Sequence, residues 1–197
     1  LEFDSSFTKK DIKIVGQYKN TYILVENEDN LEIIDQHIAD ERYIYEQLKK
    51  QKQVSSQLLI VSDVLDINPE DLIIIEEAEK KLEKFGYKIE KLSENRIIFK
   101  KIPQVLSRVK PQDILSELLY NLRDVPEGDL DTAEEKILIT TACKAAIKAG
   151  DKLTPWQAEE TVRNLRTTEN PYTCPHGRPI SHFISHKEIA SYFNRNM

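Results

Sequence analysis

Cysteine, histidine and net positive charge are scarce in this chain. Its 197 residues include two cysteines and four histidines, and 28 Lys and Arg stand against 34 Asp and Glu, a formal net charge of −6. The number and placement of the cysteines indicate thiols kept for metal rather than for disulfides, so we expect a reducing, cytoplasmic location. The negative net charge opposes tight, unaided binding to a polyanion such as DNA.

Long apolar runs, internal repeats and low-complexity tracts are absent as well. No run is long enough to span a bilayer, so we expect no membrane partner. The length suits one substantial domain or two small ones.

The patterning along the chain predicts a discontinuous domain of the α/β (α+β) class. Residues 1–56 and 130–197 combine strand patterns with helices. Residues 57–129 follow a different order of helix and strand patterns, which predicts an α-β-β-α insertion. The insertion contains a helix over about 69–85, a hairpin of strands 87–89 and 96–99, and a helix over about 111–123.

The most informative segment is residues 35–46, which read D-Q-H-I-A-D-E-R-Y-I-Y-E. Two strand patterns, 22–25 and 31–34, precede it and are joined by a polar turn. Asp35 then stands in the N-cap position of a helix that runs to about residue 50.

His37 and Glu41 lie one turn apart on the predicted inward face of that helix. An unpaired inward carboxylate costs several kcal/mol or becomes protonated, so a cation is expected beside it. A metal ion is one such partner, and Asp35 could add an oxygen from the start of the helix. The alternative is a hydrogen-bonded core histidine and a Glu41 that pairs with a lysine.

The two cysteines and a further histidine extend the set of candidate ligands. Cys174 and His176 form a C-x-H pair in a loop punctuated by prolines, which is either a metal site or a chance pairing. Cys143 lies on a helix predicted over 132–149 that ends at Gly150, where a buried small hydrophobe is the alternative role. Zinc accepts mixed nitrogen, sulfur and oxygen ligands, so it would suit the set His37, Glu41, Cys143, Cys174 and His176.

Three separated motifs resemble those of MutL-type DNA mismatch repair proteins. Residues 35–46 match the family's endonuclease motif D-Q-H-A-x-x-E-x-x-x-x-E, with Ile38 in place of alanine. Residues 142–144 resemble its A-C-R/K element, and residues 174–179 match its C-P-H-G-R-P element in full. The motifs occur in the family's order and span most of the chain, so the resemblance is to the C-terminal dimerisation and nicking domain.

The resemblance implies a metal-dependent endonuclease that nicks one strand of duplex DNA. Asp35, His37 and Glu41 would be the catalytic residues, and Cys143, Cys174 and His176 would hold a zinc ion. It further implies Mn²⁺ as the activating ion, a homodimer in bacteria, and MutS and the sliding clamp as partners. The family's ATP-binding pattern is not found here, so ATP would act only through an N-terminal domain outside this sequence.

The resemblance also implies a strand-rich dimerisation subdomain, residues 1–56 and 130–197, interrupted by a small regulatory subdomain, residues 57–129. Gln57, Leu58, Leu59, Ile60, Val61 and Ser62 resemble the family's clamp-binding element Q-x-x-I/L-x-P, with serine in place of proline. A plain buried strand is the alternative for this segment.

Alternatives to a nuclease remain open at this stage. Glu46, the last acid of the motif, could form a surface i, i+4 ion pair with Arg42 instead of a catalytic contact. The whole chain could be a non-catalytic dimerisation module braced by zinc. A metallohydrolase acting on a small substrate would suit the acidic charge but would not explain three ordered motifs.

Overall fold

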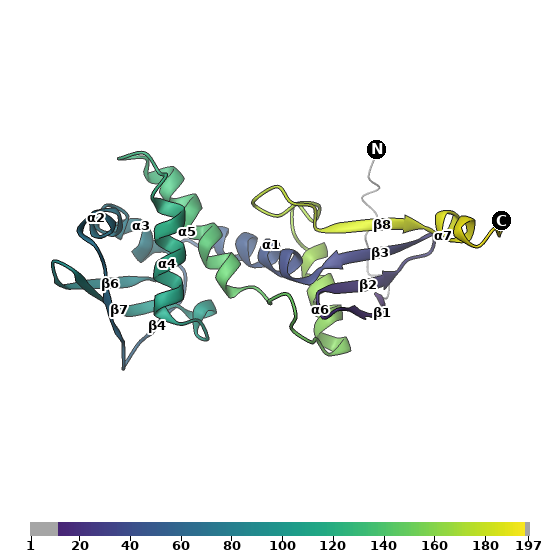
Figure 1. Cartoon of the computed structure of the whole chain (residues 1–197), viewed down its shortest axis with the longest axis horizontal. Helices are drawn as coiled ribbons and strands as arrows, with labels where there is room; N and C mark the ends of the chain where they lie inside the picture. The colour runs from purple at the N-terminus through teal and green to yellow at the C-terminus, as the bar shows by residue number, and fades with distance from the viewer. Residues whose placement is uncertain (1–11, 196–197) are drawn as a thin grey trace. The chain divides into compact units, whose positions relative to one another are not determined.

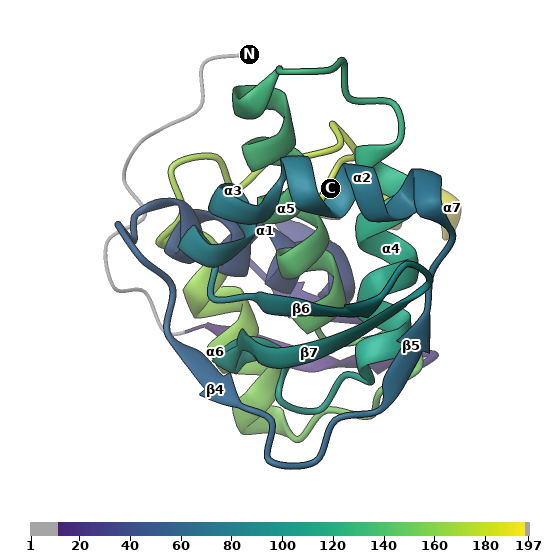
Figure 2. The same ribbon diagram turned by 90° about the vertical axis from the view of Figure 1, so that its left-hand side faces the viewer.

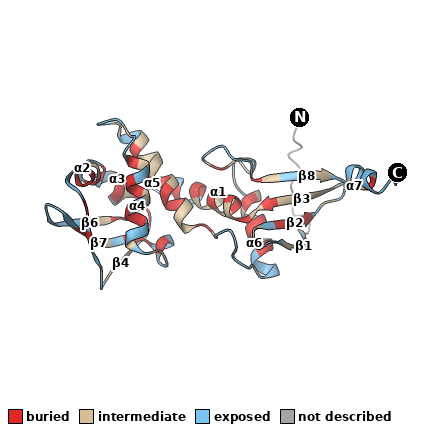
Figure 3. Cartoon of the chain, in the orientation of Figure 1, coloured by how far each residue is buried: buried red, intermediate tan, exposed pale blue. Residues whose placement is uncertain are grey.

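The computed structural model describes residues 12–195 (Figure 1). The chain forms two compact units, and each has a buried core of its own (Figure 3). Unit 1 holds the described residues up to Tyr43 and those from Ala146 onward, and unit 2 runs from Ile44 to Ala145. Both units combine antiparallel sheets with helices, which confirms the predicted α+β class. No helix between residues 12 and 195 is long and apolar enough to cross a membrane.

Unit 1 is built on a four-stranded antiparallel sheet with the order β1-β2-β3-β8. Its elements are β1 (Lys13–Tyr18), β2 (Tyr22–Glu26), β3 (Asn30–Asp35), the start of α1 (Gln36–Lys49), α6 (Pro155–Arg166), β8 (Ser181–Ser185) and α7 (His186–Tyr192). The two predicted strands and the helix that follows them are therefore confirmed. The turn between the strands is closed by a 2.9 Å hydrogen bond from the Asn27 N–H to the Asn30 carbonyl.

Alternation along β2 and β3 gives this sheet one core face. Ile23 and Ile34 are opposite each other in the register, and both are fully buried. Val162 of α6 and Ala39 of α1 belong to the same core, and neither has any exposed surface. Burying apolar surface in this way stabilises the unit by about 25 cal/mol for each Å² removed from water.

The opposite face of the sheet is apolar but open. Leu24 is opposite Ile33 in the register, and Leu31 is opposite Ile184 on β8; all four are only partly buried. An apolar sheet face that keeps solvent access is typical of an interaction surface.

Unit 2 contains the second sheet, in which β7 pairs with β4, β5 and β6, all antiparallel (Figure 2). Its elements are β4 (Ser56–Leu58), β5 (Val64–Asp66), α2 (Pro69–Glu77), α3 (Glu79–Lys84), β6 (Lys88–Ser93), β7 (Arg96–Pro103), the 3-10 turn η1 (Gln104–Leu106), α4 (Pro111–Leu122) and α5 (Leu130–Ala145). The predicted hairpin and the helix beginning at Pro111 are confirmed. Ile114 and Leu118, one turn apart on α4, are fully buried in the core of this unit.

The single helix predicted over 69–85 is wrong, because the chain bends at Ala78. That residue ends α2 and precedes α3 with φ −83° and ψ −1°. Ile75 and Leu82, on either side of the bend, are both buried in the core of unit 2, where they are 4% and 2% exposed.

The helix predicted over 132–149 begins earlier and ends at Ala145. It stops there because the backbone N–H and carbonyl of Ile147 bond to side chains of α1 and cannot continue a helical ladder. Because α5 packs on α3 and α4, the compact units divide after Tyr43 and Ala145, not at the predicted subdomain boundaries 56/57 and 129/130. Residues 1–11 and 196–197 of the predicted dimerisation subdomain lie outside the described residues.

Candidate metal centre

The start of α1 is set by Asp35, the last residue of β3. Its Oδ1 accepts hydrogen bonds from the backbone N–H groups of His37 (3.0 Å) and Ile38 (3.1 Å). These bonds satisfy two of the amide groups that a helix leaves unpaired at its first turn. The predicted N-cap is confirmed, and Asp35 Oδ2 has no hydrogen-bond partner among the described residues.

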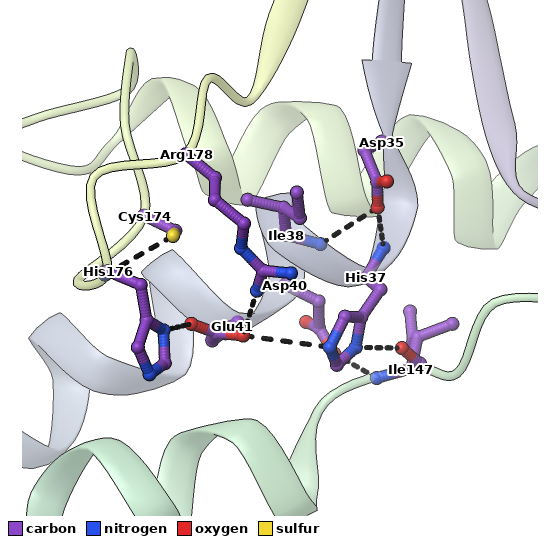
Figure 4. Close-up of polar contacts among 9 residues, drawn as sticks. All are labelled: Asp35, His37, Ile38, Asp40, Glu41, Ile147, Cys174, His176 and Arg178. Carbon is purple, nitrogen blue, oxygen red and sulfur yellow. Dashed lines mark hydrogen bonds and ion pairs between the residues drawn. The ribbon is translucent and has the colours of Figure 1, made fainter.

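Glu41 is the centre of the site and its side chain has no exposed surface (Figure 4). Glu41 Oε1 lies 3.1 Å from His176 Nδ1. Glu41 Oε2 lies 3.6 Å from His37 Nε2 and 3.4 Å from Arg178 Nη2. The partners of this buried carboxylate within the described chain are therefore two histidines and an arginine, so the predicted lysine alternative is wrong.

Cys174 and His176 are held beside Glu41 by a tight loop. The Cys174 N–H donates to the Arg178 carbonyl, and the Gly177 N–H donates to the Cys174 carbonyl, both at 2.9 Å. Gly177 has a φ of +82°, a conformation in which glycine carries no steric cost. The His176 N–H points at Cys174 Sγ over 3.3 Å, which fixes the position of the thiol beside His176.

The loop is also tied to α1. Arg42 Nε donates a 2.7 Å hydrogen bond to the Thr173 carbonyl. Arg42 and Glu46 are both buried, with 8% and 5% of their surfaces exposed, so neither lies on the surface, where the alternative placed their ion pair. Lys50 Nζ lies 3.9 Å from the Glu46 carboxylate.

Glu41, Cys174 and His176 are a candidate set of ligands for a metal ion such as zinc. Each offers one ligand atom, and these three atoms all lie within 4.8 Å of one another. Ligands at about 2.0–2.3 Å from a tetrahedral ion are separated by distances of this order. The donors are an oxygen, a sulfur and a nitrogen, a mixture that zinc accepts and that Mg²⁺ or Ca²⁺ does not favour.

The side chain of His37 is held by the backbone of Ile147, at the start of the second chain segment of unit 1. Its Nδ1 lies 2.8 Å from the Ile147 carbonyl oxygen, and the Ile147 N–H donates to Asp40 Oδ2 over 2.9 Å (Figure 4). Burial raises the pKa of the Asp40 carboxyl, while the hydrogen bond from Ile147 opposes that rise.

Gln36 anchors the same region of the chain. Its side chain is fully buried, and its Nε2 lies within 3.0 Å of the carbonyl oxygens of Asn20, Lys148 and Asp151. Sequence reasoning assigned no role to Gln36 or Asp40. The available signal was the spacing, since Asp40 stands three residues after His37 and therefore lies beside it on the helix.

The predicted site residues are only partly brought together. Within unit 1, His37, Cys174 and His176 gather around Glu41. Asp35 joins no cluster of three or more potential metal ligands among the described residues, so its role as a ligand stays a prediction. Cys143 lies on α5 in unit 2, and its role as a ligand stays a prediction.

The fold and this cluster define an α+β domain with a histidine, cysteine and carboxylate centre. A family model described as the MutL C terminal dimerisation domain matches residues 15–153. The chain therefore belongs to the MutL C-terminal dimerisation domain family, as the three motifs predicted.

Full-length relatives agree with this assignment. The chain is 35% identical over 188 residues to the DNA mismatch repair protein MutL of Clostridium botulinum (strain Kyoto / Type A2), a match that covers 94% of this chain and 28% of that protein. It is 36% identical over 188 residues to the protein of the same name from Thermoanaerobacter pseudethanolicus, covering 95% of this chain and 31% of that protein. The chain thus spans less than a third of the length of these relatives.

Proposed function

We propose that this domain is a metal-dependent endonuclease that nicks one strand of duplex DNA during mismatch repair. The observation that carries the proposal is the buried Glu41 carboxylate, whose two oxygens face different ligand groups. Glu41 Oε1 faces His176, beside Cys174, whereas Oε2 faces His37 and the guanidinium of Arg178. Retaining such a buried charge is costly unless cations compensate for it.

The donor chemistry differs on the two sides of Glu41. Cys174 and His176 supply sulfur and nitrogen, which suit a zinc ion that braces the site. His37 Nε2 and Glu41 Oε2, with Asp35 Oδ2 at the start of the same helix, supply nitrogen and oxygen, which suit Mn²⁺. A divalent ion held by these residues would neutralise charge on the phosphate and lower the pKa of the attacking water.

The test of this function is a nicking assay on supercoiled plasmid with Mn²⁺, with zinc content measured on the same preparation. The matched variant is Asp35→Asn, whose expected result opens the Discussion. A non-catalytic, zinc-braced dimerisation module is the competing function. It predicts bound zinc and no Mn²⁺-dependent nicking by the wild-type chain, with or without a clamp.

Recruitment to DNA is proposed to depend on partners. A net charge of −6 does not supply the phosphate-driven affinity of a self-sufficient DNA-binding protein. The sliding clamp, a MutS-type mismatch recognition protein and the remainder of the full-length chain would raise the local concentration of DNA.

The segment from Gln57 to Ser62 has the exposure that clamp docking requires. Leu58, Ile60 and Val61 are 67%, 92% and 88% exposed, so the alternative of a plain buried strand is wrong for these positions. At the position of the family's proline, the Ser62 hydroxyl donates to the Phe99 carbonyl and fixes the end of the segment on β7. Exposed apolar side chains on a segment that is held in place by a hydrogen bond are typical of a docking motif.

The double substitution Gln57→Ala and Ile60→Ala is expected to remove stimulation of nicking by the clamp. Basal Mn²⁺-dependent nicking should stay at the wild-type rate, because neither residue is a candidate metal ligand or catalytic residue. Plasmid nicking with and without clamp measures both quantities. Leu92→Ala, which removes an exposed apolar side chain from β6 of the same unit, is the matched control. Equal stimulation of the double variant and the wild type would refute the docking site.

Homodimer formation, which the family assignment supports, is proposed to use the open apolar face of unit 1. Ile33 lies at the centre of that face, opposite Leu24 on one side and His182 on the other. Ile33→Glu is expected to raise the dimer dissociation constant at least about tenfold, because a carboxylate would be desolvated in the interface.

Sedimentation equilibrium measures that constant, and circular dichroism checks that the variant folds. Val64→Glu, on an exposed strand position of unit 2, is the control and should leave the dimer unchanged. If a folded Ile33→Glu variant dimerised with wild-type affinity, the dimer interface would not include this face.

A further inference from the structure

The backbone of one residue, Ile147, is held at two points by α1. The Ile147 carbonyl oxygen lies 2.8 Å from His37 Nδ1, and the Ile147 N–H donates to Asp40 Oδ2 over 2.9 Å (Figure 4). His37 and Asp40 are three residues apart, so both side chains project from the same side of α1. The residue on which they converge is more than a hundred positions away in sequence.

The hydrogen bond determines which nitrogen of His37 carries the proton. A carbonyl oxygen only accepts hydrogen bonds, so Nδ1 must be the donor in this contact. In the neutral imidazole the other nitrogen, Nε2, then holds a lone pair. Nε2 is the atom that lies 3.6 Å from Glu41 Oε2. The lone pair is therefore presented on the side of the ring where a metal would bind.

Asp40 acts on this arrangement without touching the cluster of Glu41, Cys174 and His176. Within the described chain its hydrogen bond is to the Ile147 N–H, and that bond holds the backbone of Ile147, whose carbonyl meets His37, against α1. If the backbone of Ile147 moved away from α1, His37 Nδ1 would lose its acceptor. The proton could then move to Nε2 and donate to Glu41, which would block the nitrogen ligand.

We propose that Asp40 is a positioning residue that acts through the backbone of Ile147 and holds His37 in the Nδ1–H tautomer with Nε2 available to a metal ion. Gln36 supports the same segment, because its Nε2 donates to the Lys148 carbonyl over 2.9 Å and to the Asp151 carbonyl over 3.0 Å. The consequence for metal binding rests on the proposed function, whereas the tautomer is a property of the metal-free chain.

The tautomer is measured by two-bond nitrogen–proton correlation NMR on the metal-free chain, at about pH 8.5, where histidine is mostly neutral. The His37 signal is assigned by its loss in His37→Gln, and the other three histidines serve as internal references. The wild-type chain should show protonated Nδ1. Asp40→Ala should shift His37 toward protonated Nε2, whereas Asp40→Asn keeps an acceptor oxygen for Ile147 and should retain the wild-type pattern.

Asp129→Ala provides the matched control. Asp129 also accepts a backbone N–H with its carboxylate, that of Thr132 at 3.1 Å, but it lies in unit 2 at the start of α5. Removing the Asp129 side chain should weaken the N-terminal cap of α5 and leave the His37 tautomer unchanged.

The second measurement is the Mn²⁺ dissociation constant by isothermal titration. Loss of a residue that orients a histidine ligand typically weakens metal binding 10–100-fold, so about tenfold is expected for Asp40→Ala and no change for Asp40→Asn. Protonated Nε2 in the wild-type chain would overturn the proposal without any variant, as would an unchanged His37 tautomer in a folded Asp40→Ala chain. Absence of Mn²⁺ binding by the wild type would instead refute the proposed function, and the tautomer measurement would still decide the role of Asp40.

Discussion

Asp35→Asn is expected to abolish Mn²⁺-dependent nicking and to leave the fold and the dimer intact. Asparagine keeps an oxygen that can accept the N–H groups of His37 and Ile38, and it is as good an N-cap as aspartate. The substitution therefore separates the two functions of this side chain. It removes the negative charge that the Oδ2 side offers to an ion and preserves the start of α1.

The expected loss in nicking rate is about 100-fold or more, because removing a ligand should cost at least as much as removing a group that merely orients one. Conversion of supercoiled to relaxed plasmid measures the rate, and thermal unfolding checks the fold. Asp29→Asn, on the exposed turn between β2 and β3, is the matched control and should nick at the wild-type rate. Nicking by Asp35→Asn at that same rate would refute the catalytic assignment of Asp35.

Cys174→Ser is expected to lose the bound zinc and to lower thermal stability. Serine replaces the soft thiolate by a hydroxyl that stays protonated at neutral pH and is a poor zinc ligand. The Cys174 side chain is only 2% exposed and belongs to the core of unit 1, so the ion and the fold are coupled there. Metal that binds only the native state adds its binding free energy to the free energy of unfolding.

A loss of about 3–4 kcal/mol would lower the unfolding temperature by roughly 10 °C in a chain of this size. Elemental analysis gives the zinc content, and calorimetry gives the unfolding temperature. Chelation should reproduce the loss in the wild type and cause no further change in Cys174→Ser. His186→Ala, which removes an exposed histidine from the start of α7, is the control. A Cys174→Ser chain with full zinc content would show that Cys174 is not a ligand.

Much of the local architecture could be predicted because its causes are local. The turn before β3, the Asp35 cap and the start of α4 at Pro111 each depend on residues within a few positions of one another. The inward direction of Glu41 followed from helical spacing, and its burial confirms it. The pairing of Glu41 with the loop of Cys174 and His176 was a prediction from motifs, since spacing alone cannot bring together residues more than 130 positions apart.

The amino-acid sequence by itself thus determined the family, the α+β class and the candidate ligands of this domain. Only the tertiary structure decided that α5 ends at Ala145, that Ile60 is exposed, and that Asp40 and Gln36 hold the segment after α5. The physical reason is that these outcomes depend on long-range contacts. A backbone group such as the N–H of Ile147 bonds to whichever partner the packed chain brings within about 3 Å. The periodicity of the sequence does not identify that partner.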